Sequence, residues 1–217
     1  MTGSAAPPAG PAGATLSRPH VFLPGTGGPP LLLLHGTGGD ENDLLGLGRR
    51  FSPGSELLSP RGTVLEHGMP RFFRRLAEGV LDEDDIRART DELAAFLTAA
   101  GDRYGVATGS LVAVGFSNGA NTASALLARH PDVLAGAVLI GAMPPFAAGL
   151  GEAVLTGTPV LVINGRQDPI VSRAQTTALV GQLDTTGARV TRLDHDGGHT
   201  VPAGLVARMA EFVTALA

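Results

Sequence analysis

Lysine, cysteine and tryptophan are absent from this chain of 217 residues, so that all 16 basic residues are arginine. Without lysine there is no Walker A phosphate loop and no Schiff-base catalysis by a lysine amine. Without cysteine there is no thiol nucleophile, disulfide, iron–sulfur cluster or thiolate zinc site. These absences remove whole classes of catalysis.

Positive charge is also too sparse to attract polyanions. The chain carries 20 acidic against 16 basic residues, for a net charge of -4, and shows no basic cluster. A chain with this charge balance has no basic surface of the kind that binds nucleic acid or an anionic membrane. The uncharged run from Val133 to Gly151 contains Pro144 and Pro145, which predicts a buried strand followed by a loop. We expect no nucleic-acid partner and no stable membrane insertion.

Because the N-terminal segment lacks the features of a signal peptide, we expect a cytoplasmic protein.

Length and composition predict one folded domain preceded by a tail. The 43% of apolar residues can build a core, and 217 residues are few for two domains. Residues 1–17 consist largely of Ala, Pro and Gly and offer hardly a large apolar side chain. We therefore expect a disordered tail over 1–17 and a domain over 18–217.

Short apolar runs alternate with longer amphipathic segments after the tail. Continuous apolar runs, as in strands of a parallel sheet covered on both faces, occur at 31–34, 111–114, 137–140 and 160–163, with weaker strands at 57–59 and 189–193. Helices are expected from Asp82, from Ser117 to Pro131, over 173–183 and from about Ala203. The alternation predicts an α/β fold with a doubly wound, mostly parallel sheet.

A Gly-x-Ser-x-Gly motif lies between an expected strand and an expected helix, with Ser117 at its centre. This placement is typical of a nucleophile elbow, in which a strained turn exposes the serine hydroxyl. The alternative is a glycine-rich turn in which Ser117 only caps the following helix. The context favours a nucleophile.

An acid and a histidine follow Ser117 in the order that the elbow fold uses. Asp168 comes shortly after an expected strand, and His199 follows the next one, beyond Gly197 and Gly198. We expect His199 to take the proton of Ser117 and Asp168 to orient the imidazole. His195 is the rival base. A metal site formed by Asp194, His195, Asp196 and His199 is a further alternative, but all four lie on one loop, and we expect no metal and no cofactor.

The oxyanion hole requires one N–H just after the nucleophile and one from the loop after an earlier strand. Asn118 supplies the first, and Thr37, which follows the run 31–34, supplies the second. His35 and Gly36 would shape that turn. The glycines of this loop do not form a dinucleotide-binding fingerprint, because Glu41 stands where its third glycine belongs.

The motifs Leu-His-Gly-Thr-Gly-Gly-Asp-Glu, Gly-Phe-Ser-Asn-Gly, Gly-Arg-Gln-Asp-Pro and Gly-Gly-His together resemble the phospholipase/carboxylesterase family of α/β-hydrolases, over about 21–217. The resemblance implies a compact fold without a large cap domain and the cleavage of carboxylic esters or thioesters. Its motifs do not separate short-chain acyl or aryl esters from lysophospholipids or acyl thioesters.

The substrate pocket is less well defined by the sequence. Phe72, Phe73, Met143 and Pro144 are candidate pocket residues, with core packing as the alternative for each. We predict a serine esterase with an acyl-enzyme intermediate and a small-molecule ester as partner. The alternative from another class is a non-catalytic binding protein of the same fold. The oligomeric state stays open between a monomer and a homodimer.

Overall fold

The computed structural model describes residues 16–216. The expected tail over 1–17 therefore lies almost wholly outside the described residues. At its end, Leu16 packs against the hydrophobic core, so the folded part begins slightly before residue 18.

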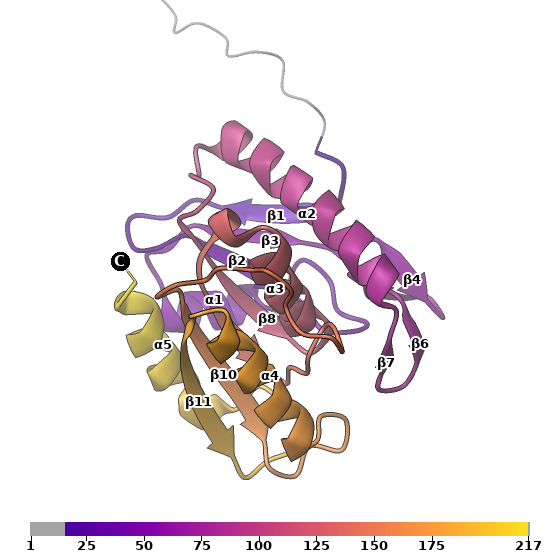
Figure 1. Ribbon diagram of the computed structural model, residues 1–217. Helices are drawn as coiled ribbons and strands as arrows, with labels where there is room; N and C mark the ends of the chain where they lie inside the picture. The colour runs from indigo at the N-terminus through magenta and orange to yellow at the C-terminus, as the bar shows by residue number, and fades with distance from the viewer. Residues whose placement is uncertain (1–15, 217) are drawn as a thin grey trace, which may run out of the picture.

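The centre of the molecule is a seven-stranded sheet with the order β1-β3-β2-β8-β9-β10-β11 (Figure 1). From β3 to β11 all neighbouring strands are parallel, and only the edge strand β1 pairs antiparallel, with β3. The doubly wound, mostly parallel sheet is confirmed. Its strands are β1 His20–Leu23, β2 Leu31–Leu34, β3 Leu57–Pro60, β8 Leu111–Phe116, β9 Leu134–Ile140, β10 Pro159–Gly165 and β11 Arg189–His195.

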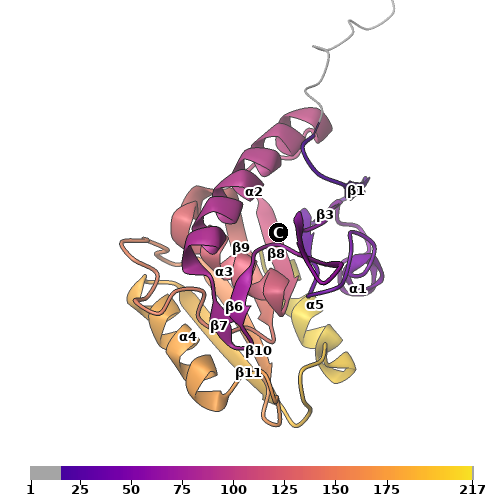
Figure 2. The same ribbon diagram turned by 90° about the vertical axis from the view of Figure 1, so that its right-hand side faces the viewer.

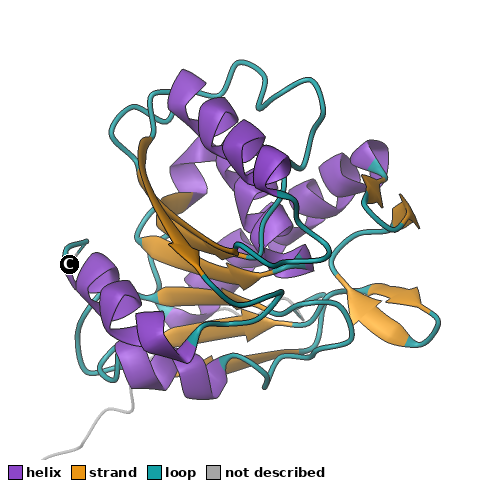
Figure 3. Ribbon diagram, turned by 90° about the horizontal axis from the view of Figure 1, so that it is seen from below, coloured by secondary structure: helices purple, strands orange, loops and turns teal. Residues whose placement is uncertain are grey.

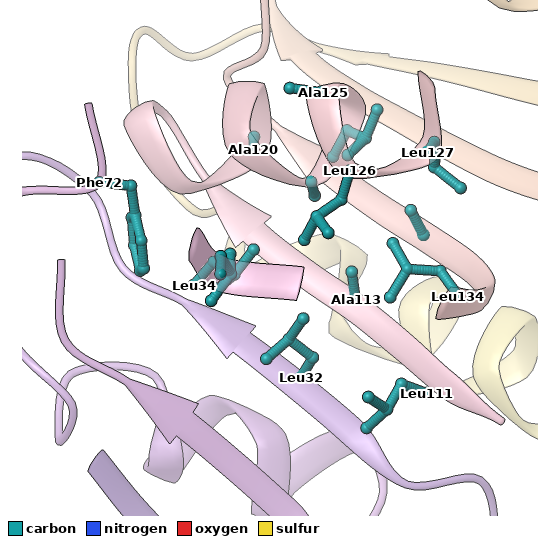
Figure 4. Packing of buried hydrophobic residues seen from close by; sticks show 14 of the residues in the cluster. Leu32, Leu34, Phe72, Leu111, Ala113, Ala120, Ala125, Leu126, Leu127 and Leu134 are labelled. Atoms are coloured by element: carbon teal, nitrogen blue, oxygen red, sulfur yellow. The ribbon is translucent and has the colours of Figure 1, made fainter. Parts of the chain in front are cut away.

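The four leucines of β2 explain why this segment lies at the centre of the sheet. All are 0% exposed, with Leu31 and Leu33 in one hydrophobic cluster and Leu32 and Leu34 in the other. Burying a leucine side chain contributes about 2 kcal/mol, so both faces of the strand favour coverage by helices. Figure 4 shows Leu32 and Leu34 packed with side chains of β8 and α3.

Five α-helices within residues 16–216 cover the two faces of the sheet (Figure 3). α1 and α5 pack on one face and α2, α3 and α4 on the other, as the two hydrophobic clusters show. No helix in this part of the chain has the length and apolar character needed to cross a membrane. The helices are α1 Leu45–Phe51, α2 Glu83–Tyr104, α3 Asn118–Arg129, α4 Arg173–Thr185 and α5 Val206–Thr214.

Helix boundaries follow local capping chemistry. The side chain of Asp82 accepts a hydrogen bond from the N–H of Asp85 at the start of α2, which ends at Gly105 in the left-handed region, with φ 75°. Ser172 and Gln175 form a capping box at the start of α4. The 3₁₀ turn Ala203–Leu205 precedes α5, so the expected last helix starts three residues later than its predicted beginning at 203.

Two small hairpins interrupt the alternation between β3 and α2. The strands β4 Val64–Glu66 and β5 Met69–Arg71 form one hairpin, and β6 Arg75–Ala77 and β7 Val80–Leu81 form the other. We call residues 61–81 the hairpin segment. β6 and β7 lie near the first turns of α2 in Figures 1 and 2, and Figure 1 shows them apart from the main sheet. The apolar patterns of the sequence do not predict these four short strands.

Three histidines, His20, His67 and His130, lie in or at the ends of secondary-structure elements. His20 lies in β1, and its Nε2 is 2.7 Å from the hydroxyl of Tyr104. His67 occupies the turn between β4 and β5, where it has φ 51°. His130 is the C-terminal cap residue of α3, and its Nε2 lies 2.8 Å from Asp91 Oδ1.

Candidate active site

Ser117 occupies a strained turn between the end of β8 and the start of α3. Its backbone has φ 52° and ψ -115°, a conformation that costs free energy for any residue other than glycine. The Ser117 N–H donates to the Ile140 carbonyl, which ties the turn to β9 at 2.8 Å. The Ser117 side chain makes no capping hydrogen bond to α3, so the alternative of a mere helix cap is wrong. The hydroxyl is instead exposed to the cavity described below.

Gly119 is the position that lets α3 start so close to the sheet. A Cβ atom there would lie 2.1 Å from the carbonyl oxygen of Leu34, far inside van der Waals contact. Any side chain at this position would push α3 away from the end of β2. The second glycine of the motif therefore fixes the distance between Ser117 and the loop after β2.

His199 joins Ser117 to Asp168 through two short hydrogen bonds. Its Nε2 lies 2.8 Å from Ser117 Oγ, and its Nδ1 lies 2.7 Å from Asp168 Oδ2. With the proton on Nδ1 donated to the carboxylate, Nε2 is free to accept the Ser117 proton. The structure thus brings together the three residues selected from sequence, from loops that follow β8, β10 and β11.

Asp168 is itself held by the backbone that follows it. Its side chain is 0% exposed, and its Oδ1 accepts hydrogen bonds from the N–H groups of Ile170, at 2.8 Å, and Val171, at 2.9 Å. These bonds leave Oδ2 directed at the imidazole. A buried, hydrogen-bonded carboxylate of this kind can fix the orientation of a histidine ring and stabilise its protonated form.

Gly141 forms a close wall beside the imidazole. It has φ 64°, and a Cβ atom on it would lie 2.9 Å from Cε1 of His199. Phe116 borders the same ring, with 5.1 Å between the ring centroids. The imidazole therefore occupies space that only a glycine leaves free.

The other polar residues around His199 have partners of their own. Nδ1 of His195 accepts a hydrogen bond from the N–H of Gly197 at 3.2 Å, Asp194 pairs with Arg192, and Asp196 pairs with Arg166. Since His199 points to Ser117, the four side chains do not converge on one point. Within residues 16–216 no group of three or more His, Asp or Glu side chains is arranged to hold a metal. The alternative of a metal site on this loop is therefore wrong.

Thr37 and Asn118 border the same cavity as Ser117 and His199. Thr37 follows β2, and Asn118 is the first residue of α3, where a backbone N–H has no acceptor within the helix. Neither backbone N–H has a hydrogen-bond acceptor among the described residues. Two backbone donors beside a serine hydroxyl can stabilise a negative charge that develops on a carbonyl oxygen.

The hairpin segment holds both of these residues, a role that sequence reasoning missed. Arg71 Nη1 donates to Thr37 Oγ1 at 2.7 Å, and the N–H of Phe72 donates to Asn118 Oδ1 at 2.7 Å. The N–H of Gly38 donates to the carbonyl of Pro70 at 2.9 Å. Nothing in the local sequence around 70–72 indicates these contacts, because their partners lie elsewhere in the chain.

His35 supports the turn after β2 from within the core, as expected of a residue that shapes this turn. It is 1% exposed, its Nδ1–H donates to the carbonyl of Gly36 at 2.7 Å, and its Nε2 accepts from the N–H of Gly62 at 3.0 Å. Burial lowers the pKa of His35 below its ordinary value of 6.5. The ring is thus held neutral, with one donor and one acceptor both in use.

A cavity of about 280 Å³ opens above Ser117. Its wall includes Met143, as the sequence indicated, together with Phe116, Leu81 and Ile170. A volume at the lower limit of small-molecule sites accommodates a small substrate group rather than a long chain.

The other three candidate pocket residues do not line this cavity. Phe72 and Phe73 are 2% and 1% exposed and belong to the hydrophobic core, where Figure 4 shows Phe72. Large aromatic side chains gain more by full burial than at a wet cavity wall, so the core alternative holds for both. Pro144 is half-buried beside Met143 but is not part of the wall.

Comparison with known proteins supports the same chemistry. Residues 88–210 match the family described as serine hydrolase (FSH1). The chain is 46% identical over 180 residues to the putative hydrolase MhqD of Bacillus subtilis strain 168, an alignment that covers 83% of this chain and 90% of that protein.

Solved structures of carboxylesterases share the fold. The Bacillus cereus carboxylesterase is 43% identical with a TM-score of 0.89, and the match covers 93% of this chain and 95% of that one. The Mesorhizobium loti carboxylesterase is 32% identical with a TM-score of 0.84, over 91% of this chain and 94% of that one. The α/β-hydrolase fold without a large cap domain and the resemblance to carboxylesterases are confirmed.

Proposed function

Because the chain belongs to the FSH1 serine hydrolase family, we propose that it cleaves small carboxylic esters with Ser117 as nucleophile, His199 as general base and Asp168 as the orienting carboxylate. Members of this family are hydrolases, so the alternative of a non-catalytic binding protein is excluded. The observation that carries the proposal is the unbroken hydrogen-bonded series Asp168–His199–Ser117, which ends at the cavity.

The proposed reaction proceeds in two balanced steps. Ser117 Oγ attacks the ester carbonyl carbon while its proton passes to His199 Nε2, and the N–H groups of Thr37 and Asn118 stabilise the oxyanion. The carbon–oxygen bond to the alcohol then breaks, and the alcohol leaves with the proton from His199. Water next gives a proton to His199 and attacks the acyl carbon. The carboxylic acid is released as Ser117 regains its proton.

The size of the cavity bears on the choice of substrate. About 280 Å³ suits a short acyl or aryl group better than the long chain of a lysophospholipid. A thioester of the same small acyl group would undergo the same attack, since the leaving sulfur needs no additional protein group. Rates for 4-nitrophenyl esters of increasing acyl length, beside thioesters of the same acyl groups, distinguish these substrates.

A fluorophosphonate tests the nucleophile directly. We expect one adduct on the intact protein, detected by mass spectrometry, and none on Ser117→Ala, because only an activated hydroxyl attacks phosphorus rapidly. Ser124→Ala is the control, since Ser124 lies on the buried side of α3 and its variant should still label. Equal labelling of wild type and Ser117→Ala would remove Ser117 from the mechanism.

Dialysis against EDTA should leave ester hydrolysis unchanged, because the proposed steps use only protein groups and water.

A further inference from the structure

The charged residues in the cavity wall are both positive. Arg71 and Arg75 both line the cavity, and no aspartate or glutamate is among its lining residues. Asp168 stands behind His199, fully buried and occupied by its own hydrogen bonds. The wall around a ligand beside Ser117 therefore contains two arginines and no aspartate or glutamate.

One carboxylate serves both arginines. Glu66 Oε2 lies 3.2 Å from Arg71 Nε, and Glu66 Oε1 lies 2.8 Å from Arg75 Nε. The hydrogen bond from Arg75 lowers the pKa of Glu66, so this carboxyl group carries its charge at neutral pH. A single negative charge balances only one of the two guanidinium groups. The cavity wall keeps about one positive charge in excess.

Hydrogen-bond donors remain unused on the same two arginines. Arg71 Nε donates to the Phe73 carbonyl and Nη1 to Thr37, while its Nη2 has no acceptor among residues 16–216. Arg75 uses only Nε, for Glu66, within the described part of the chain. Arg71 is 4% exposed, so water compensates its charge poorly. Buried or half-buried donors of this kind favour a charged acceptor brought by a ligand.

We infer that the cavity selects small esters that carry a carboxylate, held by Arg75 and Arg71 while the ester carbonyl meets Ser117. The inference rests on the proposed hydrolysis by Ser117 and adds the substrate class. The cavity volume of about 280 Å³ suits a small dicarboxylate half-ester or an ester of a small hydroxy acid. The arginines contribute binding, and the covalent steps stay as described above.

Paired substrates test the inference. In one arm mono-4-nitrophenyl glutarate is compared with 4-nitrophenyl pentanoate, which places the carboxylate on the acyl side. In the other, 4-acetoxybenzoate is compared with its methyl ester, which places it on the alcohol side. We expect kcat/KM to favour the charged member of at least one pair, and Arg75→Gln to reduce that preference about tenfold, mainly through KM, as loss of a charged hydrogen bond does.

Arg74→Gln is the matched control. It removes the same charge from the neighbouring residue, which pairs with Asp82 and does not line the cavity, and it should leave the preference unchanged. Arg71 is left intact because it also holds Thr37. Comparing ratios between variants cancels the intrinsic reactivity of each ester.

The outcomes separate this inference from the proposed function. If the folded protein hydrolyses the neutral esters and Arg75→Gln leaves both charged-to-neutral ratios at their wild-type values, the inference is overturned. If the folded protein hydrolyses none of the four esters, ester hydrolysis itself is overturned. Inhibition of wild-type protein by glutarate and by pentanamide needs no variant: about tenfold stronger inhibition by glutarate is expected, and equal inhibition contradicts the inference.

Discussion

The two sides of the active-site cavity are built in different ways. Ser117 and His199 lie on loops at the carboxyl ends of parallel strands of the main sheet, whereas Arg71, Arg75 and Leu81 belong to the hairpin segment, outside that sheet. Leucines of β2 are 0% exposed, but Leu65 and Leu76 of the hairpins are 70% and 68% exposed. Ser117 and His199 are thus held by the main sheet, while the hairpin segment is held by Phe72 and Phe73 in the core and by ion pairs and hydrogen bonds near its strands.

The largest expected effect concerns the side built on the sheet. His199→Ala should lower kcat/KM for a 4-nitrophenyl ester by about 10⁴-fold or more, because the base and the orientation of Ser117 are lost together. His195→Ala should retain near wild-type activity, since the hydrogen bond of its imidazole is to the N–H of Gly197 and not to Ser117. Circular dichroism checks that both are folded. The reverse pattern would transfer the role of base to His195.

A pair of leucine substitutions sharpens the contrast in stability. Leu33→Ala should reduce the free energy of unfolding by about 2–5 kcal/mol, since its side chain is wholly buried and leaves a cavity. Leu65→Ala, at an exposed hairpin position, should change it by no more than about 0.5 kcal/mol. Urea unfolding monitored by circular dichroism measures both. Similar losses in the two variants would mean that Leu65 contributes to stability as a buried leucine does.

A smaller effect should appear where the two sides meet. Thr37→Val removes the oxygen that accepts from Arg71 but keeps the backbone N–H of residue 37. We expect kcat to fall about tenfold with little change in KM, because a shifted N–H loses part of its bond to the oxyanion. Steady-state kinetics measure this, with Thr214→Val, on the surface of α5, as control. A change confined to KM would place Thr37 in substrate binding instead.

The smallest expected effect is a pH dependence of stability due to His35. Because burial lowers the pKa of His35, the unfolded chain takes up a proton near pH 6.5 while the folded protein does not. Stability is therefore fully present above about pH 6.5 and is lost as pH falls toward the folded-state pKa. Urea unfolding between pH 8 and pH 5 should show a shallower loss for His35→Gln than for wild type. His67→Asn, in an exposed turn, should show the same pH dependence of the free energy of unfolding as wild type. If His35→Gln also showed the wild-type pH dependence, His35 would not be its cause.

Sequence reasoning was most successful where one local signal determines the structure. Continuous apolar runs marked β2, β8, β9 and β10, because a strand buried on both faces needs no polar side. Ser117, Asp168 and His199 could be selected as candidates because their chain order and their positions after strands are set by the fold. Their hydrogen bonds in the structure agree with that reasoning.

Elements that depend on tertiary contacts were missed. α1 is seven residues long and contains Gly46 and Gly48, so its helix propensity is low, and packing against Leu33 and Leu57 decides its conformation. The hairpin strands are two or three residues long and carry the ion pairs of Glu66 with arginines. For the same reason Phe72 and Phe73 resembled pocket residues in the sequence, although the fold places both in the core.

The close approach of Gly141 to His199 determines where this enzyme can be altered by laboratory evolution. With φ 64° and no room for a Cβ atom, position 141 should return only glycine from a library of random substitutions selected for activity. Arg75 and Leu81 meet the cavity from short, peripheral strands and can accept exchange without displacing the imidazole. New substrate preferences should therefore arise from libraries directed at the hairpin segment, with the loops at the carboxyl ends of the sheet strands left unchanged.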